Sequence, residues 1–297
     1  THPLRFYTAA DKTGGEYTTG VTTSGTAGSS GATVTITIAA SAPTLYYQCS
    51  SHAGMGGQIN TNSTLGSSNF DGSIQSTVKV SAISGFSIIA FEGTGSLGTV
   101  GHGLGVKPDV MIFKNRDAGH GWNTYHSSLG ATKNLELQKT DGEETASNKF
   151  NDTEPTSTVM TVNTAADTNQ NNMSMICYCF SSVAGYSKFG SYTGNNNADG
   201  TFVFLGFRPA WILIKRTSSA ANWILFDSKR YVSNLGYGNS AYLFPNTSVA
   251  EATTEDIDIL SNGFKLRQAS GYFNYPSGGN FIYLAFAESP FKNARAR

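Results

Sequence analysis

One stretch of the chain occurs twice, first as Gly105-Val106-Lys107-Pro108-Asp109-Val110-Met111-Ile112-Phe113-Lys114 and again as Gly206-Phe207-Arg208-Pro209-Ala210-Trp211-Ile212-Leu213-Ile214-Lys215. Gly-x-x-Pro ahead of an apolar run sets a turn and fixes where a strand begins. A tryptophan follows each stretch, Trp122 in one copy and Trp223 in the other, and the equivalent positions are 101 residues apart. The constant offset predicts a duplicated domain, either two similar β-sandwiches or two halves of one sandwich.

The rest of the sequence is also typical of strands. Short apolar runs, such as residues 175–180 and 281–286, are bounded by clusters of Gly, Asn, Ser or Pro, and we find no convincing amphipathic helix. The chain contains 33 Gly, 18 Phe and 14 Tyr among 297 residues, which favours short strands joined by many turns. We therefore predict an all-β chain whose two repeats are β-sandwiches of a jelly-roll-like kind.

Four segments follow from these patterns. An N-terminal module is expected over residues 1–61, the first repeat over 85–184 and the second over 185–297. Residues 62–84 are polar and rich in turn formers, so we predict a linker or strap there.

Charge and hydropathy exclude two kinds of partner. Charged residues make up 13% of the chain and the net charge is +0, so no basic face is expected to bind nucleic acid. No apolar stretch approaches the roughly 20 residues of a membrane span. The first residues, Thr1 to Phe6, read like the inside of a strand, and we expect the chain to be a processed or incomplete piece of a longer one.

The cysteines do not form a disulfide framework, because three of them cannot all pair within one chain. Cys177 and Cys179 stand two apart in an apolar run and are expected as core thiols. Cys49 instead begins the loop Cys49-Ser50-Ser51-His52-Ala53-Gly54-Met55. Thiolate, imidazole and a weak thioether on one short loop are three ligands of a blue-copper site, and His2 is the candidate for the second imidazole. The alternative is a packed loop without metal.

The Tyr46-Tyr47-Gln48-Cys49-Ser50-Ser51-His52 segment resembles the C-terminal half of cupredoxins, in which Tyr-Tyr-x-Cys-x-x-His ends the penultimate strand. The short loop looks most like the amicyanin version. The resemblance covers about residues 1 to 61, with residues 58–61 as the final strand. It implies a partial cupredoxin-like Greek-key module that binds copper through His2, Cys49, His52 and Met55.

Aromatic residues after polar loops are the candidates for ligand binding. Trp122, Tyr125 and Trp223 lie at or near the starts of predicted strands. We expect both tryptophans to pack in a core or an interface, and sugar stacking is the alternative. His102, His120 and His126 are expected in turns or at the surface. Carboxylates are scattered through polar loops and no facing pair is evident, so no catalytic residue is predicted and the chain is not expected to be an enzyme.

The repeats resemble a domain that recurs in tail-fibre-like and other virion proteins of marine bacteriophages, cyanophages included. The similarity spans roughly residues 61 to 294 and is carried by phrases such as Val100-Gly101-His102-Gly103-Leu104-Gly105, Tyr186-Ser187-Lys188-Phe189-Gly190-Ser191-Tyr192-Thr193-Gly194, Gly206-Phe207-Arg208-Pro209-Ala210 and Leu260-Ser261-Asn262-Gly263-Phe264-Lys265-Leu266-Arg267.

This resemblance implies a structural or adhesion protein at the outer surface of a virion, in a tail fibre, a spike or a fibre attached to the capsid. Expected partners are other virion proteins, further copies of the chain, with a homotrimer favoured, and a glycan or protein receptor on the host surface. Two other functions stay open: a copper electron-transfer protein and a depolymerase of surface polysaccharides.

Overall fold

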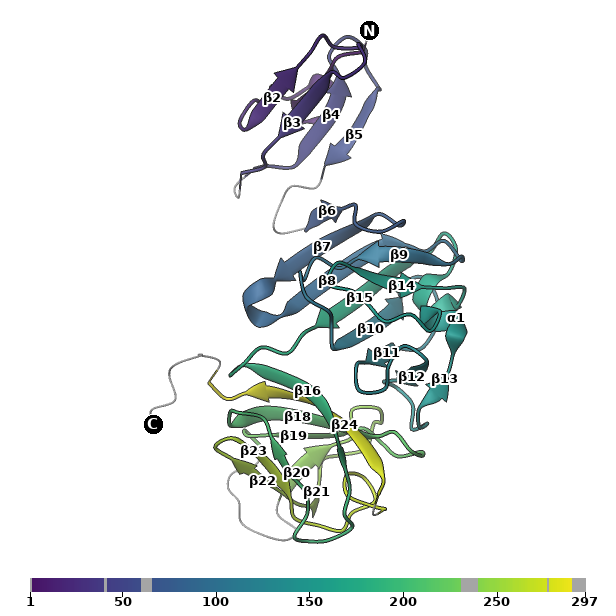
Figure 1. Ribbon diagram of the computed structural model, residues 1–297, viewed down its shortest axis with the longest axis vertical. Coiled ribbons are helices and arrows are strands. Elements are labelled where there is room, and N and C mark those ends of the chain that lie inside the picture. Colours follow the sequence, from purple (N-terminus) through teal and green to yellow (C-terminus); the bar gives the residue numbers. More distant parts are fainter. Residues whose placement is uncertain (1, 40–41, 60–65, 231–239, 277, 290–297) are drawn as a thin grey trace.

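The computed structural model describes residues 2–39, 42–59, 66–230, 240–276 and 278–289 (Figure 1). Nearly all regular structure is antiparallel β, and the two α-helices of the described residues, α1 (Ser147–Phe150) and α2 (Ala166–Asn169), have one turn each. The predicted all-β fold class is confirmed. Figure 1 shows three parts along the long axis, with the N-terminal module at one end and the second repeat at the other. Within the described residues, no helix has the length and apolarity needed to span a membrane.

The N-terminal module is a three-stranded sheet beside a hairpin. The sheet has the order β1 (Leu4–Tyr7), β4 (Leu45–Cys49) and β5 (Gly56–Ile59), and the hairpin joins β2 (Val21–Ser24) to β3 (Thr33–Ile36). Phe6, Tyr7 and Leu45 are its buried apolar side chains on β1 and β4. The final strand predicted at 58–61 starts two residues earlier, and residues 60 and 61 lie outside the described part.

The first repeat is a sandwich built on an eight-stranded sheet. Its second layer is the pair β9 (Gly98–Gly101) and β14 (Val159–Val162). Between the layers lies a core that contains Ile89, Phe113 and Met160, all fully buried. The strands of the large sheet, in spatial order, are β13 (Glu144–Thr145), β12 (Lys133–Glu136), β11 (Asn123–His126), β10 (Val110–Asn115), β15 (Ser174–Phe180), β8 (Phe86–Glu92), β7 (Ser76–Ser81) and β6 (Ser67–Asn69).

The predicted linker over residues 62–84 needs correction, because its described part belongs to this sandwich. β7 pairs with β8 over its whole length, from Ser76 opposite Phe91 to Ser81 opposite Phe86. Ile74 and Val78 enter the core. Apolar anchors separated by polar residues suit a strand with one buried face, which the low overall hydropathy of the segment concealed.

The second repeat has the same topology. Its main sheet has the order β16-β24-β18-β19-β20-β21, which matches β8-β15-β10-β11-β12-β13 of the first repeat strand for strand. A second layer of β17, β23 and β22 replaces the β9–β14 pair. The predicted pair of similar sandwiches is therefore present. The strands are β16 (Ser187–Thr193), β17 (Phe202–Phe204), β18 (Pro209–Arg216), β19 (Ile224–Asp227), β20 (Ser240–Leu243), β21 (Ala252–Glu255), β22 (Ile257–Leu260), β23 (Gly263–Leu266) and β24 (Asn280–Ala287).

A third hydrophobic core joins the two sandwiches back to back. It lies between the outer faces of the two large sheets and is formed by the buried residues Val110, Leu135, Phe189, Leu213, Trp223, Ile282 and Leu284. The half-buried side chains of Ile112, Phe180 and Trp211 pack against it. The two repeats consequently form one stack of four β-layers.

His126 lies in this interface, so the surface position expected for it is wrong. The ring is fully buried, Nε2 donates to the carbonyl oxygen of Tyr283 at 3.4 Å, and Nδ1 accepts from the Ser128 backbone N–H at 3.1 Å. Burial lowers the pKa of His126 from its usual 6.5 to about 4, although the bond to Tyr283 opposes the shift. His102 is also buried, with the same pattern of one donated and one accepted bond, and burial lowers its pKa too.

We predict that acid weakens the stack through His126. Between the unfolded pKa near 6.5 and the folded pKa near 4, the unfolded chain holds more protons, so stability falls as the pH drops through this window. The loss attributable to His126 is at most about 3 kcal/mol. A His126→Gln variant keeps an N–H donor for Tyr283 without titrating. Urea unfolding at about pH 7 and about pH 4.5 should give a flatter pH dependence for the variant.

The difference between the two proteins isolates His126, because His102 titrates in both. Equal loss of stability on acidification in the wild type and the variant would contradict the prediction.

Candidate metal centre

The register of the N-terminal sheet places the metal loop beside the start of β1. Leu4 pairs with Cys49, the last residue of β4, and the Ser50 backbone N–H donates to the carbonyl oxygen of Pro3 at 2.8 Å. His2, two residues before β1, is thereby brought to the loop that leaves β4. A residue 47 positions away in sequence thus becomes a neighbour of Cys49 through one strand pairing.

Three of the four predicted ligands converge at this point. The Sγ of Cys49 lies 3.4 Å from Nδ1 of His52 and 3.7 Å from Nδ1 of His2, and the two Nδ1 atoms are 3.1 Å apart. The three donor atoms all lie within 4.8 Å of one another. Cys49 is buried, whereas both imidazoles are exposed. One thiolate and two imidazoles in this cluster are the trigonal donor set of blue-copper sites.

The loop is held closed from both ends. Cys49 N–H donates to the Met55 carbonyl oxygen at 2.8 Å, and Gly54 N–H donates to Oδ1 of Asp11 at 2.8 Å. Met55 lines a cavity of about 320 Å³ together with His2 and Cys49, and its side chain is 46% exposed. Met55, predicted as the weak fourth ligand, therefore borders the same cavity as His2 and Cys49. Asp11 could not be identified from the sequence, because nothing in its local pattern shows that it fastens this loop.

The surroundings of Cys49 favour the thiolate. Burial raises the pKa of its thiol. Hydrogen bonds from His52, from the Ser51 backbone N–H at 3.4 Å and from His2 lower the pKa by a larger amount, to about 6. A thiolate is the form that binds a metal, so the residues present fit copper. Bound copper would supply one-electron redox chemistry. The chain itself supplies a buried sulfur, two imidazoles and a backbone N–H aimed at the sulfur, which orients the ligand.

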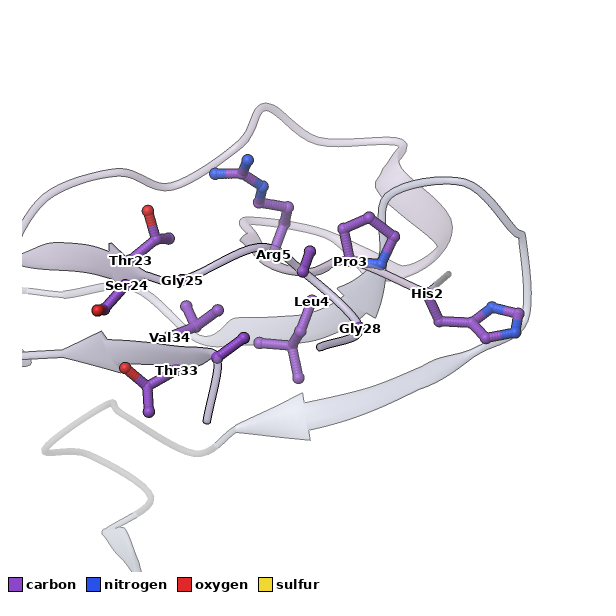
Figure 2. A pocket seen from close by; sticks show the side chains of 12 residues that line it. His2, Pro3, Leu4, Arg5, Thr23, Ser24, Gly25, Gly28, Thr33 and Val34 are labelled. Atoms are coloured by element: carbon purple, nitrogen blue, oxygen red, sulfur yellow. The ribbon is translucent and has the colours of Figure 1, made fainter. Parts of the chain in front are cut away.

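A groove runs from this centre along β1. It has a volume of about 410 Å³ and lies between residues 2–5 and the β2–β3 hairpin. Figure 2 shows His2 at one end of the groove and Thr23, Ser24 and Thr33 towards the other. Of the three clustered side chains, His2 lines this groove.

A protein-family model described as Domain of unknown function (DUF7483) matches residues 59–290. The chain belongs to this family. The comparison with curated proteins and the comparison with solved structures give no match. The DUF7483 region comprises both sandwiches, including β6 and β7, and the metal centre lies ahead of it.

Within the DUF7483 region, the three aromatic candidates have different surroundings. Tyr125 and Trp223 are fully buried, so the structure places them in packing and not at a surface that could receive a ligand. The Tyr125 hydroxyl donates to Oε2 of Glu154 at 2.6 Å. Trp122 is half-buried and lines an open cavity.

The two cysteines of the DUF7483 region are core thiols, as the sequence indicates. Cys177 and Cys179 are fully buried, unpaired and 3.7 Å apart at their sulfurs. Burial raises the pKa of Cys177 well above its usual value, so this thiol is a poorer metal ligand than that of Cys49.

We predict that the protein binds one copper ion through Cys49. Added Cu(II) should produce a strong absorbance near about 600 nm, typical of a copper–thiolate bond. Cys49→Ser should abolish this band because it removes the thiolate, and His52→Ala should weaken binding at least tenfold, about 1.4 kcal/mol. The measurement is a copper titration followed by visible absorbance and elemental analysis.

Cys179→Ala is the matched control, because it removes a thiol from the core and leaves the cluster intact. The prediction fails if the wild type remains colourless and elemental analysis finds no copper.

Proposed function

We propose that the chain is a non-enzymatic structural and adhesion protein of a bacteriophage virion, exposed at the surface of the particle, with a copper-binding module at its N-terminal end. The observation that carries the structural part is the third core. A tandem of domains joined only by a linker would move as separate bodies, whereas two sheets that share buried side chains transmit force as one. A fibre or spike component needs that property.

Hydrogen bonds within the same interface support a rigid role. The Nε1 of Trp223 donates to the carbonyl oxygen of Glu136 at 3.2 Å, and Nζ of Lys215 donates to that of Thr140 at 3.0 Å. Both side chains are fully buried. Polar groups satisfied across an apolar interface fix its register, because any slip would leave buried donors without acceptors.

The edge of the second sheet supports assembly with further copies or other virion proteins. In the first sheet β7 covers β8, but the equivalent strand β16 pairs, among the described strands, with β24 alone. Ser187 of this strand exchanges backbone hydrogen bonds with Val183, and the Phe189 N–H donates to Oγ of Ser182. The rest of the seven-residue strand edge is a template for another strand. We propose that self-association, with a homotrimer favoured, covers this edge in the assembled particle.

The receptor-binding part of the proposal is tested by competition. Purified protein, added to host cells before phage, should reduce phage adsorption in a saturable manner, because it occupies the same host-surface glycan or protein. Adsorption is measured as free phage remaining after a fixed time. The N-terminal module alone, residues 1–59, makes a comparison in which no reduction is expected.

Unchanged adsorption at saturating protein would exclude receptor binding. Immunogold labelling of intact particles separates the remaining alternatives, since absence of the chain from the virion surface would exclude the structural role as well.

A second candidate function, copper electron transfer, is favoured by the cluster of His2, Cys49 and His52. It requires a reversible one-electron potential in the copper-loaded protein. Cyclic voltammetry tests it directly, and an irreversible wave would leave the module with metal binding alone.

A further inference from the structure

The duplicated Lys–Trp pair occurs in two different states. In the first repeat the ammonium of Lys114 lies 5.8 Å from the ring centre of Trp122 and donates to the carbonyl oxygen of His120. In the second repeat the equivalent Lys215 donates to the carbonyl oxygen of Ala221 at 2.9 Å. The local contact is the same in both copies.

In the second repeat, the first repeat fills the space around the pair. Besides the bonds from Trp223 and Lys215 to Glu136 and Thr140, the Ala221 backbone N–H also donates to the Thr140 carbonyl oxygen, at 2.8 Å. The indole N–H of Trp223, the ammonium group of Lys215 and the Ala221 backbone N–H are thus three neighbouring donors, and all of them bind oxygen atoms of the first repeat.

In the first repeat the same donors open on a cavity of about 680 Å³. Trp122 and Lys114 are both half-buried, and within the described residues the indole N–H of Trp122 has no acceptor comparable to Glu136. The volume falls within the roughly 300–1,000 Å³ typical of small-molecule sites. No described residue accepts a hydrogen bond from this indole N–H as Glu136 does from Trp223 in the second copy.

Asp167, which also lines the cavity, holds a buried acceptor. Asp167 is 7% exposed; its Oδ2 accepts from Lys149 and from Nδ2 of Asn123, but its Oδ1 has no hydrogen-bond partner. An unpaired buried carboxylate oxygen is costly unless a ligand donates to it. The cavity therefore combines the indole N–H of Trp122, an ammonium group with protons left to donate, a carboxylate oxygen without a partner and one aromatic ring.

We infer that this cavity binds a neutral saccharide, with a pyranose ring against Trp122. Hydroxyl groups both donate and accept, so adjacent hydroxyls can meet the Asp167 oxygen and the Lys114 and Trp122 donors, while the apolar face of the sugar contacts the indole. The lining is mostly polar, which favours a polyhydroxylated ligand over the polypeptide that fills the second copy. Charges in the wall are paired, Lys149 with Asp167 and Lys139 with Glu136, and this favours a neutral sugar.

This inference rests on the adhesion role proposed above and names its receptor as a glycan. Its test uses the full chain in solution without phage or cells. Saturation-transfer-difference NMR is recorded with a panel of methyl glycosides and disaccharides of glucose, galactose, mannose and N-acetylglucosamine. We expect saturable transfer to the ring protons of at least one sugar, and Trp122→Ala should lower its affinity about tenfold. Asp167→Asn should also weaken binding, because it replaces one carboxylate oxygen by a donor.

The matched control is Phe204→Ala. It removes another aromatic ring that lies beneath a lysine, since Nζ of Lys188 is 5.3 Å from the Phe204 ring centre. Phe204 belongs to the second repeat and is 57% exposed, so it is not part of the cavity. Sugar binding should be unchanged in this variant. Thermal unfolding of each variant checks that the sandwiches remain folded.

The inference is overturned if no sugar of the panel binds the wild type, or if folded Trp122→Ala binds as the wild type does. It is also overturned if Trp122→Ala dissociates an oligomer while no sugar binds, because the surface then receives polypeptide. If the protein blocks phage adsorption but binds no sugar, the saccharide site is excluded and the adhesion role remains. If it binds sugar but has no effect on adsorption, the saccharide site remains and the adhesion role is excluded.

Discussion

The burial of Trp223 between the two large sheets is the contact on which the stacked arrangement depends. Aromatic side chains bury a large apolar area, about 150–250 Å² each, and Trp223 is fully buried in the third core. Its indole N–H would be an unsatisfied donor there without the Glu136 carbonyl oxygen. Packing and hydrogen bonding thus demand the same relative position of the two sandwiches, and that agreement makes the interface specific.

Lys215 imposes a second condition on the same interface. Its side chain is fully buried, and burial lowers the pKa of its ammonium group to about 8. Three backbone carbonyl oxygens accept from it, those of Thr140, Arg216 and Ala221. Because an uncompensated buried charge is strongly destabilising, the loop that contains Thr140 must remain in place whenever Lys215 is charged. In the first repeat, no described loop covers Lys114 in this way, and its ammonium group lines an open cavity while it donates to the His120 carbonyl oxygen. Duplication followed by one-sided burial explains how identical residues acquired different surroundings.

The sequence predicted the parts of this protein that depend on local pattern or on a fixed offset. Alternating apolar runs identified strands such as β8, β10 and β15, and the 101-residue offset identified the two sandwiches. The spacing of Cys49, His52 and Met55 identified one side of the metal cluster. What it could not predict depends on partners distant in sequence. The burial of His126 requires Tyr283, 157 residues away, and the strand character of residues 76–81 becomes evident only when they pair with β8. The carboxylate of Asp11 fastens the metal loop from 43 residues away.

The candidate metal centre and the stack are physically separable. The three clustered ligands, and the partners that hold their loop closed (Pro3, Asp11, Lys12, Ser50 and Met55), all lie between residues 2 and 59. The family match begins where β5 ends, at Ile59. Each part also has its own buried side chains, Phe6, Tyr7 and Leu45 in the module and three separate cores in the stack. The cluster is therefore preorganised by the strand pairing of β1 with β4 and needs no contact from the sandwiches. The sandwiches in turn are held together by Trp223 and Lys215, which need no metal.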